Sequence, residues 1–310
     1  MLTEQEKQDF VLSTINPMAD TTLPFLTRVV GVIDDQTGEH RGTGFFCMLG
    51  GRQAVVTAAH VLRDAAKTGR FQSLAFTRGP GEPPGIVAGT ITYADQFDLA
   101  IYLPSRSFPI GEQKSFWPEE RIERNPDLLL KDYLFVQGFP RRFSRFTTLG
   151  GNALVSETLA YGAMMRYRSC DVPSDEKRQF DRDLPDYPYL PDEFLQPHQF
   201  ALNFSVEPAS FIAPGGRGLE QRQSIISDWS EVFQANPETT FGDTFPEQKS
   251  RGAHGMSGSP VWRIGAASRP VKDWSPSWSQ LIGIVTGWNE ARQVLVATSA
   301  SKLDEVLKTP

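Results

Sequence analysis

The segment Gly255-Met256-Ser257-Gly258-Ser259-Pro260 runs directly into the apolar pair Val261-Trp262. Its serine is flanked by glycines, just before residues typical of a buried strand. Because glycine adopts positive φ easily, such a turn could direct two backbone N–H groups at a developing oxyanion beside an exposed hydroxyl. The alternative is a simple tight turn, since G-x-S-G segments are common in loops. Other residues must discriminate between these two interpretations.

A catalytic serine needs an imidazole to accept its proton, and the imidazole needs a carboxylate that fixes its tautomer. His60 follows the apolar segment Val55-Val56-Thr57-Ala58-Ala59, and Asp98 lies within Phe97-Asp98-Leu99-Ala100-Ile101, where we expect a strand. A carboxylate inside an apolar strand is costly unless it is hydrogen-bonded. Each residue alone has an ordinary structural explanation, a strand-end histidine or a turn aspartate. With Ser257 they form a more specific pattern, in the order His, Asp, Ser.

Composition excludes several other classes of function. The chain has 310 residues, with 31 Lys and Arg against 37 Asp and Glu, for a net charge of −6. This charge disfavours a nucleic-acid surface, and no apolar run is long enough to span a membrane. The four histidines have no metal-binding spacing, so we expect neither a metal nor a cofactor. The two cysteines, Cys47 and Cys170, and a polar N-terminus without a signal-like segment lead us to expect a cytoplasmic protein.

Short β-branched segments separated by turns predict an all-β fold. We expect an N-terminal lead-in over 1–25, a first β-rich half over 26–115 and a second over 116–310. The second half contains an insertion at 171–197, rich in acidic residues and proline, and ends in a helix over 301–308 capped by Ser299 or Ser301. Further helices are predicted over 4–13 and 224–235.

Taken together, these motifs resemble those of the chymotrypsin-like (trypsin-like) serine peptidases. The segments that carry the resemblance are Gly42-Thr43-Gly44-Phe45-Phe46, Thr57-Ala58-Ala59-His60, Phe97-Asp98-Leu99-Ala100, Gly255-Met256-Ser257-Gly258-Ser259-Pro260-Val261 and Leu281-Ile282-Gly283-Ile284-Val285. The order His, Asp, Ser matches this family, whereas α/β-hydrolases and subtilisins place the three residues in other orders. The resemblance implies two antiparallel six-stranded β-barrels, the first carrying His60 and Asp98 and the second Ser257.

The resemblance also implies a role for each residue. His60 is the general base and then the general acid, Asp98 orients it, and Ser257 is the nucleophile that forms an acyl-enzyme. The backbone amides of Gly255 and Ser257 form the oxyanion hole. The substrate is a protein or peptide. A regulatory protein partner is left open.

Some positions depart from the family pattern or bear on specificity. Met256 stands where secreted members carry an aspartate that pairs with a new N-terminus, so activation by that salt bridge is excluded. Ser259-Pro260 resembles the bacterial glutamyl-endopeptidase branch, which suggests a bacterial intracellular type. Arg251, six residues before the nucleophile, could favour acidic substrates or face solvent.

Two more pocket interpretations remain open. The segment Thr286-Gly287-Trp288 could fill the specificity pocket, and His254 either lines the cleft or lies on a surface loop.

The predicted function is a serine endopeptidase in regulated or defence-related intracellular proteolysis. The alternatives are a catalytically inactive peptide-binding module and an esterase with the same triad.

Overall fold

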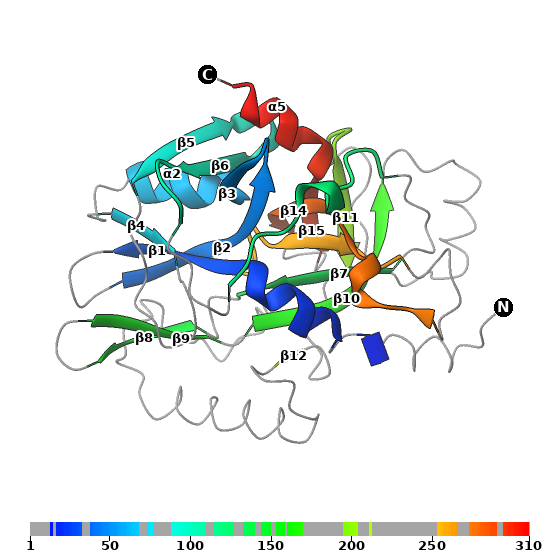
Figure 1. Ribbon diagram of the computed structural model, residues 1–310, viewed down its shortest axis with the longest axis horizontal. Coiled ribbons are helices and arrows are strands. Elements are labelled where there is room, and N and C mark those ends of the chain that lie inside the picture. Colours follow the sequence, from blue (N-terminus) through cyan, green and yellow to red (C-terminus); the bar gives the residue numbers. More distant parts are fainter. Residues whose placement is uncertain are drawn as a thin grey trace.

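Two large antiparallel β-sheets, a separate hairpin and short helices make up most of the described part of the chain (Figure 1). The computed structural model describes residues 13–14, 17–32, 38–67, 73–76, 88–108, 114–126, 133–139, 144–149, 153–158, 160–169, 195–203, 211–212, 253–265, 273–289 and 294–309. Of the sequence predictions, Arg251, the helix over 224–235, nearly all of the helix over 4–13 and most of the 171–197 insertion lie outside these residues.

The first sheet contains six strands in the order β4-β1-β2-β3-β6-β5. Its strands are β1 (Leu26–Val32), β2 (Gly38–Leu49), β3 (Arg52–Ala58), β4 (Ser73–Phe76), β5 (Gly89–Ala94) and β6 (Leu99–Pro104). The β2–β3 hairpin turns at Gly50 and Gly51, whose φ angles of +57° and +72° suit a two-residue hairpin turn. Helix α2 (Ala59–Lys67) begins directly after β3.

The second sheet has the order β11-β15-β14-β13-β7-β10-β12. Its strands are β7 (Tyr133–Gly138), β10 (Ala160–Ser169), β11 (Gln199–Asn203), β12 (Phe211–Ile212), β13 (Pro260–Arg263), β14 (Gln280–Asn289) and β15 (Val294–Ser299). Pairing of β10 with β11 closes six of these strands on themselves, and β12 adds a short seventh. A separate hairpin is formed by β8 (Ser144–Leu149) and β9 (Ala153–Thr158). The predicted all-β class with two antiparallel sheets is confirmed.

The C-terminal helix is also confirmed, although it begins as a 3-10 turn. This turn, η10 (Ala300–Lys302), precedes α5 (Leu303–Leu307), and the Ser299 side chain accepts a hydrogen bond from Ser301 N. Helix α5 contacts β5 and β6 of the first sheet. Within the described residues, the other 3-10 turns are η1 (Leu23–Phe25), η2 (Asp95–Phe97), η3 (Glu119–Arg121) and η9 (Pro276–Trp278). The predicted domain limits at 25 and 115 stay a prediction.

One apolar cluster is shared by the two sheets. Phe45 and Trp262 are fully buried and meet edge-on, with ring centroids 6.2 Å apart. Trp117 packs on both rings from the connection between the sheets, and Leu303 and Val306 of α5 join the same cluster. This cluster therefore lies between the sheets and joins them, beside separate apolar clusters within each half.

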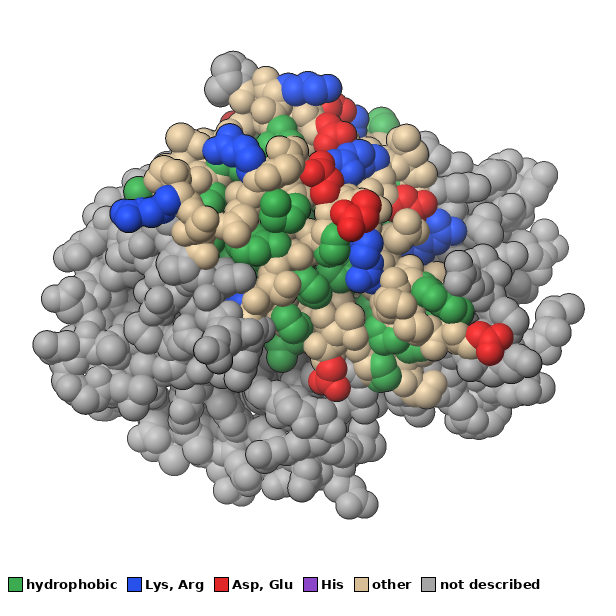
Figure 2. Space-filling model, viewed as in Figure 1, with side chains coloured by type: hydrophobic (Ala, Val, Ile, Leu, Met, Phe, Trp, Pro, Cys, Tyr) green, Lys and Arg blue, Asp and Glu red, His purple; other side chains and the backbone are tan. Residues whose placement is uncertain are grey.

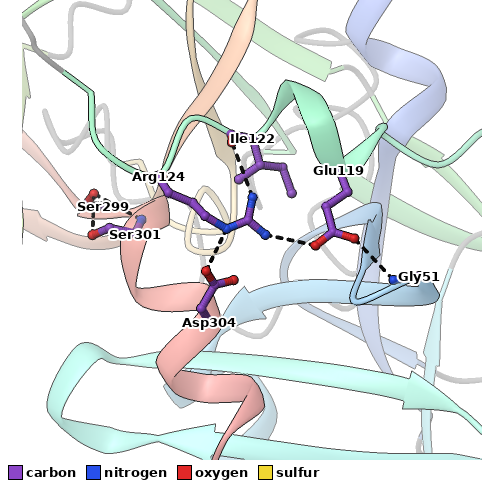
Figure 3. Close-up of polar contacts among 7 residues, drawn as sticks. All are labelled: Gly51, Glu119, Ile122, Arg124, Ser299, Ser301 and Asp304. Atoms are coloured by element: carbon purple, nitrogen blue, oxygen red, sulfur yellow. Dashed lines mark hydrogen bonds and ion pairs between the residues drawn. The ribbon is translucent and has the colours of Figure 1, made fainter.

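Charged groups fasten the connection between the sheets to α5 and to the β2–β3 turn. Arg124 lies between Glu119 and Asp304 (Figure 3), with nitrogen–oxygen distances of 3.0 and 2.7 Å. Glu119 also accepts a hydrogen bond from Gly51 N at 3.2 Å. On the face drawn in Figure 2, acidic and basic side chains of the described residues lie beside one another. No described helix is long and apolar enough to cross a membrane.

Candidate active site

Strand pairing brings His60 and Asp98 together. Ala58, at the end of β3, pairs with Leu99, at the start of β6, so the residues just after one strand and just before the other are neighbours. Asp98 Oδ2 accepts a hydrogen bond from His60 Nδ1 at 2.7 Å, and Asp98 Oδ1 accepts one from His60 N at 2.9 Å. The side chains are 40% and 31% exposed, so the hydrogen-bonded pair is partly open to solvent.

The secondary structure in which these two residues lie differs from the sequence prediction. His60 was expected at a strand end, but it is the second residue of α2. Asp98 was expected inside a strand, but it lies in the turn before β6, with φ +50° and ψ +40°. It is the one described non-glycine residue with positive φ. The prediction of a hydrogen-bonded carboxylate was correct, while its predicted burial within a strand was wrong.

Main-chain hydrogen bonds shape the turn that carries Ser257. Gly255 and Gly258 have φ angles of +92° and +90°, which glycine adopts without steric cost. Three amides of the turn donate to main-chain carbonyls: Met256 N to Ala253 O (2.9 Å), Gly258 N to Val285 O (2.7 Å) and Ser259 N to Met256 O (2.9 Å). In the part of the chain that the structure describes, the amides of Gly255 and Ser257 donate to no protein acceptor. These are the two amides that the sequence prediction assigned to an oxyanion hole.

Met256 anchors the turn in the second sheet. Its side chain is fully buried in an apolar cluster with Val261, Ile282 and Val285. Ser259 Oγ contacts the Met256 sulfur at 3.9 Å. An apolar side chain therefore occupies the position between the amides of Gly255 and Ser257 and fixes the turn by packing.

The same turn lies against the first sheet beside the start of α2. Thr43 N donates to Ser257 O at 2.9 Å. A Cβ at Gly42 would approach Ser257 O at 2.9 Å and the Val61 side chain at 2.7 Å, so only glycine allows this close contact. Ser257 therefore lies near the α2 turn that holds His60. Among the described contacts, no hydrogen bond joins Ser257 Oγ to the His60 ring.

Two buried threonines link the second sheet to the turn that carries Asp98. Thr298 Oγ1 donates to Phe97 O at 3.0 Å, and the Thr286 and Thr298 hydroxyls are 3.1 Å apart. Phe97 also packs edge-on against the His198 ring, with centroids 5.0 Å apart. The second sheet therefore helps to hold the turn that carries Asp98. Thr298 was missed by the sequence prediction, since nothing in the pattern of β15 marks its hydroxyl.

The residues predicted to form the specificity pocket are only partly placed. Thr286 is buried and bonded as described, while Gly287 and Trp288 follow it along β14 and are half-buried. His254 is exposed at the start of the turn that carries Ser257. Arg251 lies outside the described residues. Within the described residues, no group of three or more His, Cys, Asp or Glu side chains is arranged to hold a metal ion.

No protein-family model and no curated protein matches this chain. Solved structures of chymotrypsin-like serine proteases are similar to it at low sequence identity. Granzyme C is 12% identical with a TM-score of 0.44, over 94% of each chain. The active form of the Rv3671c protease from M. tuberculosis is 14% identical with a TM-score of 0.41, over 96% of this chain and 86% of that one. The scabies mite inactivated protease paralogue S-D1 is 11% identical with a TM-score of 0.44, over 93% and 92%.

Proposed function

We propose that this protein is a serine endopeptidase that cleaves peptide bonds in protein substrates through Ser257, His60 and Asp98. The observation that carries the proposal is the double hydrogen bond from His60 to the Asp98 carboxylate, at 2.7 and 2.9 Å. It holds the imidazole with Nδ1–H toward Asp98, so the basic lone pair is on Nε2. A histidine held in this way can accept a proton from a neighbouring hydroxyl.

The proposed reaction has two acyl-transfer steps. Ser257 Oγ attacks the scissile carbonyl carbon while its proton passes to His60 Nε2. The C–N bond then breaks, His60 gives the proton to the leaving amine, and the acyl group remains on Ser257. A water molecule attacks the ester in the same way and restores the free serine. Asp98 stays ionised throughout and stabilises the imidazolium.

The amides of Gly255 and Ser257 support the electrostatic part of this mechanism. Each tetrahedral intermediate carries an oxyanion, which needs hydrogen-bond donors that are already in place. These two N–H groups have no acceptor among the described residues, while Met256, Gly258 and Ser259 in the same turn use theirs. Their assignment to the oxyanion hole is part of the proposal.

A cytoplasmic location and a substrate preference belong to the proposal as well. Cys47 is a buried free thiol, and burial raises its pKa, so it stays protonated and unreactive. A free thiol suits a reducing compartment such as the cytoplasm. The preference for acidic side chains that Arg251 suggests stays a prediction. Cleavage of a peptide library after Lys, Arg or Leu, without preference for Asp or Glu, would contradict it.

The endopeptidase proposal is tested by mapping new N-termini. A denatured protein mixture is incubated with the wild type or with Ser257→Ala, and new termini are identified by mass spectrometry. We expect new internal termini with the wild type alone. Hydrolysis of simple esters without new termini would indicate an esterase instead. Termini that are equally abundant with Ser257→Ala would exclude the proposed nucleophile.

A further inference from the structure

Thr43 uses all of its polar groups at or beside the nucleophile turn, which is the turn over residues 253–259 that carries Ser257. It lies on β2 and is fully buried. Its amide donates to Ser257 O at 2.9 Å, and its carbonyl accepts from Thr57 Oγ1 at 2.7 Å. Its hydroxyl accepts from Phe139 N at 2.9 Å and contacts Gly255 O at 2.9 Å. One residue therefore contacts both halves of the protein and the turn.

The direction of the hydroxyl proton follows from these contacts. Phe139 N is a donor only, so its hydrogen must point at Thr43 Oγ1. Gly255 O is an acceptor only, so the single hydroxyl proton of Thr43 must point at that carbonyl. The chain runs from Phe139 N–H through the Thr43 hydroxyl to Gly255 O. The bond from Phe139 N is buried and the bond to Gly255 O is partly buried, and an unpaired donor or acceptor is costly away from water.

This chain fixes the peptide planes on either side of the two unpaired amides. The Gly255–Met256 peptide is held at its oxygen by Thr43 and at its nitrogen by Ala253 O. The Ser257–Gly258 peptide is held at its oxygen by the Thr43 amide and at its nitrogen by Val285 O. The amide of Ser257 lies between these two fixed planes, and the amide of Gly255 directly precedes the first.

We propose that Thr43 is a positioning residue for the oxyanion hole, because it holds the Gly255 and Ser257 carbonyls and so aims the two unpaired amides. The inference rests on the proposed function. It assigns a role to a side chain that touches neither substrate nor His60. Without the hydrogen bond from the Thr43 hydroxyl to Gly255 O, the Gly255–Met256 peptide could rotate, and the two amides would no longer point at one oxyanion.

The hydroxyl of Thr43, rather than its bulk, is what this role requires. Thr43→Val keeps the shape but leaves Phe139 N and Gly255 O without partners, whereas Thr43→Ser keeps the hydroxyl. Thr22→Val is a matched control: Thr22 is also fully buried, and its hydroxyl lies 2.8 Å from Met18 O and also contacts the Gln137 side chain, with no bond, among the described residues, to the turn that carries Ser257. It measures the cost of losing a buried hydroxyl elsewhere.

The test is the rate at which a fluorophosphonate labels each variant. The serine oxygen attacks phosphorus, fluoride leaves and the serine proton passes to His60, while the phosphoryl oxygen occupies the oxyanion hole. The rate at saturating probe is measured per folded protein, below the melting temperature of every variant. We expect Thr43→Val to lower this rate roughly tenfold to a hundredfold, with the half-saturating probe concentration unchanged. Thr43→Ser should keep it within about threefold, and Thr22→Val should lower the melting temperature alone.

Labelling of Thr43→Val at the wild-type rate would overturn the inference, as would Thr43→Ser labelling as slowly as Thr43→Val. If Thr43→Val does not fold, Thr43→Cys replaces it, since a thiol is a weak donor and should give an intermediate rate. A wild-type rate for Thr43→Cys would then overturn the inference. Absence of labelling in the wild type itself would instead contradict the proposed function on which the inference depends.

Discussion

Asp98 combines an uncommon backbone conformation with two hydrogen bonds to His60. Its φ of +50° lies in the left-handed region, where aspartate is tolerated better than most residues. The turn is held by Ala59 N, which donates to Asp98 O at 2.9 Å, and by Asp98 N, which donates to Asp95 O at 3.2 Å. A residue held in a less favourable conformation at a cluster of polar side chains is typical of functional sites.

Replacing Asp98 with asparagine should therefore impair chemistry more than folding. Asparagine tolerates the same backbone conformation. Its side chain has only one acceptor oxygen, whereas Asp98 uses two oxygens to accept from His60 N and His60 Nδ1, so asparagine favours the wrong histidine tautomer. We expect kcat for an ester substrate to fall roughly 10⁴-fold, with little change in melting temperature. Asp95→Asn is the control, because Asp95 is exposed and pairs with Arg63 instead. Equal activity of Asp98→Asn and Asp95→Asn would contradict the role of Asp98.

Gly258 gives a stability test with an internal control. A Cβ at Gly258 would overlap Thr43 O and Thr57 Oγ1, and the residue also has positive φ, at +90°. Gly51 has positive φ as well, at +72°, but open space where a Cβ would lie. We expect Gly51→Ala to lower the free energy of unfolding by about 1 kcal/mol and Gly258→Ala by about 3 kcal/mol, measured in urea. Equal losses would show that close packing at Gly258 is unimportant.

At the scale of elements, the strands could be predicted and their surroundings could not. Runs such as Val55-Val56-Thr57 and Leu281–Val285 marked strands because alternating and β-branched residues suit a sheet. Helix α2 was missed since its first residues continue the apolar run of β3, and Asp98 was placed in a strand for the same reason. The roles of Thr43 and Thr298 depend on partners distant in sequence, which no local pattern encodes.

The η3 turn should contribute to stability in a pH-dependent way. Hydrogen bonds from the main chain of Gly50 and Gly51, together with the neighbouring Arg124 guanidinium, hold the pKa of Glu119 below its ordinary value. Because folding lowers the pKa of the Glu119 carboxyl, its ionised form stabilises the folded state. This stabilisation is complete above the ordinary pKa of the carboxyl, about 4.3, and is lost as pH falls through the folded-state pKa. We expect the stability advantage of the wild type over Glu119→Gln to shrink below about pH 4.5 in urea titrations.

Glu120→Gln is the control for this prediction, because Glu120 is the next residue in the same turn and is exposed. It should not reproduce the pH dependence of Glu119→Gln. A wild-type advantage over Glu119→Gln that stayed constant from neutral pH into acid would contradict the stabilising role of the Glu119 carboxylate.

At the scale of the whole molecule, the apolar cluster shared by the sheets should make unfolding cooperative. Phe45 and Trp262 come from different sheets and are both fully buried in this cluster, so unfolding of either sheet would expose the apolar side chains that they share. We expect tryptophan fluorescence and far-ultraviolet circular dichroism to give coincident urea transitions. Two separated transitions would indicate that each sheet is stable alone.

The central claim is that Ser257 is the nucleophile of a triad completed by His60 and Asp98. It is tested most directly by treating the folded wild type and Ser257→Ala with a fluorophosphonate and locating the adduct by peptide mass spectrometry. The proposed mechanism predicts one adduct on Ser257 in the wild type and none in Ser257→Ala. An unlabelled wild type, or an adduct that persists in Ser257→Ala, would contradict it.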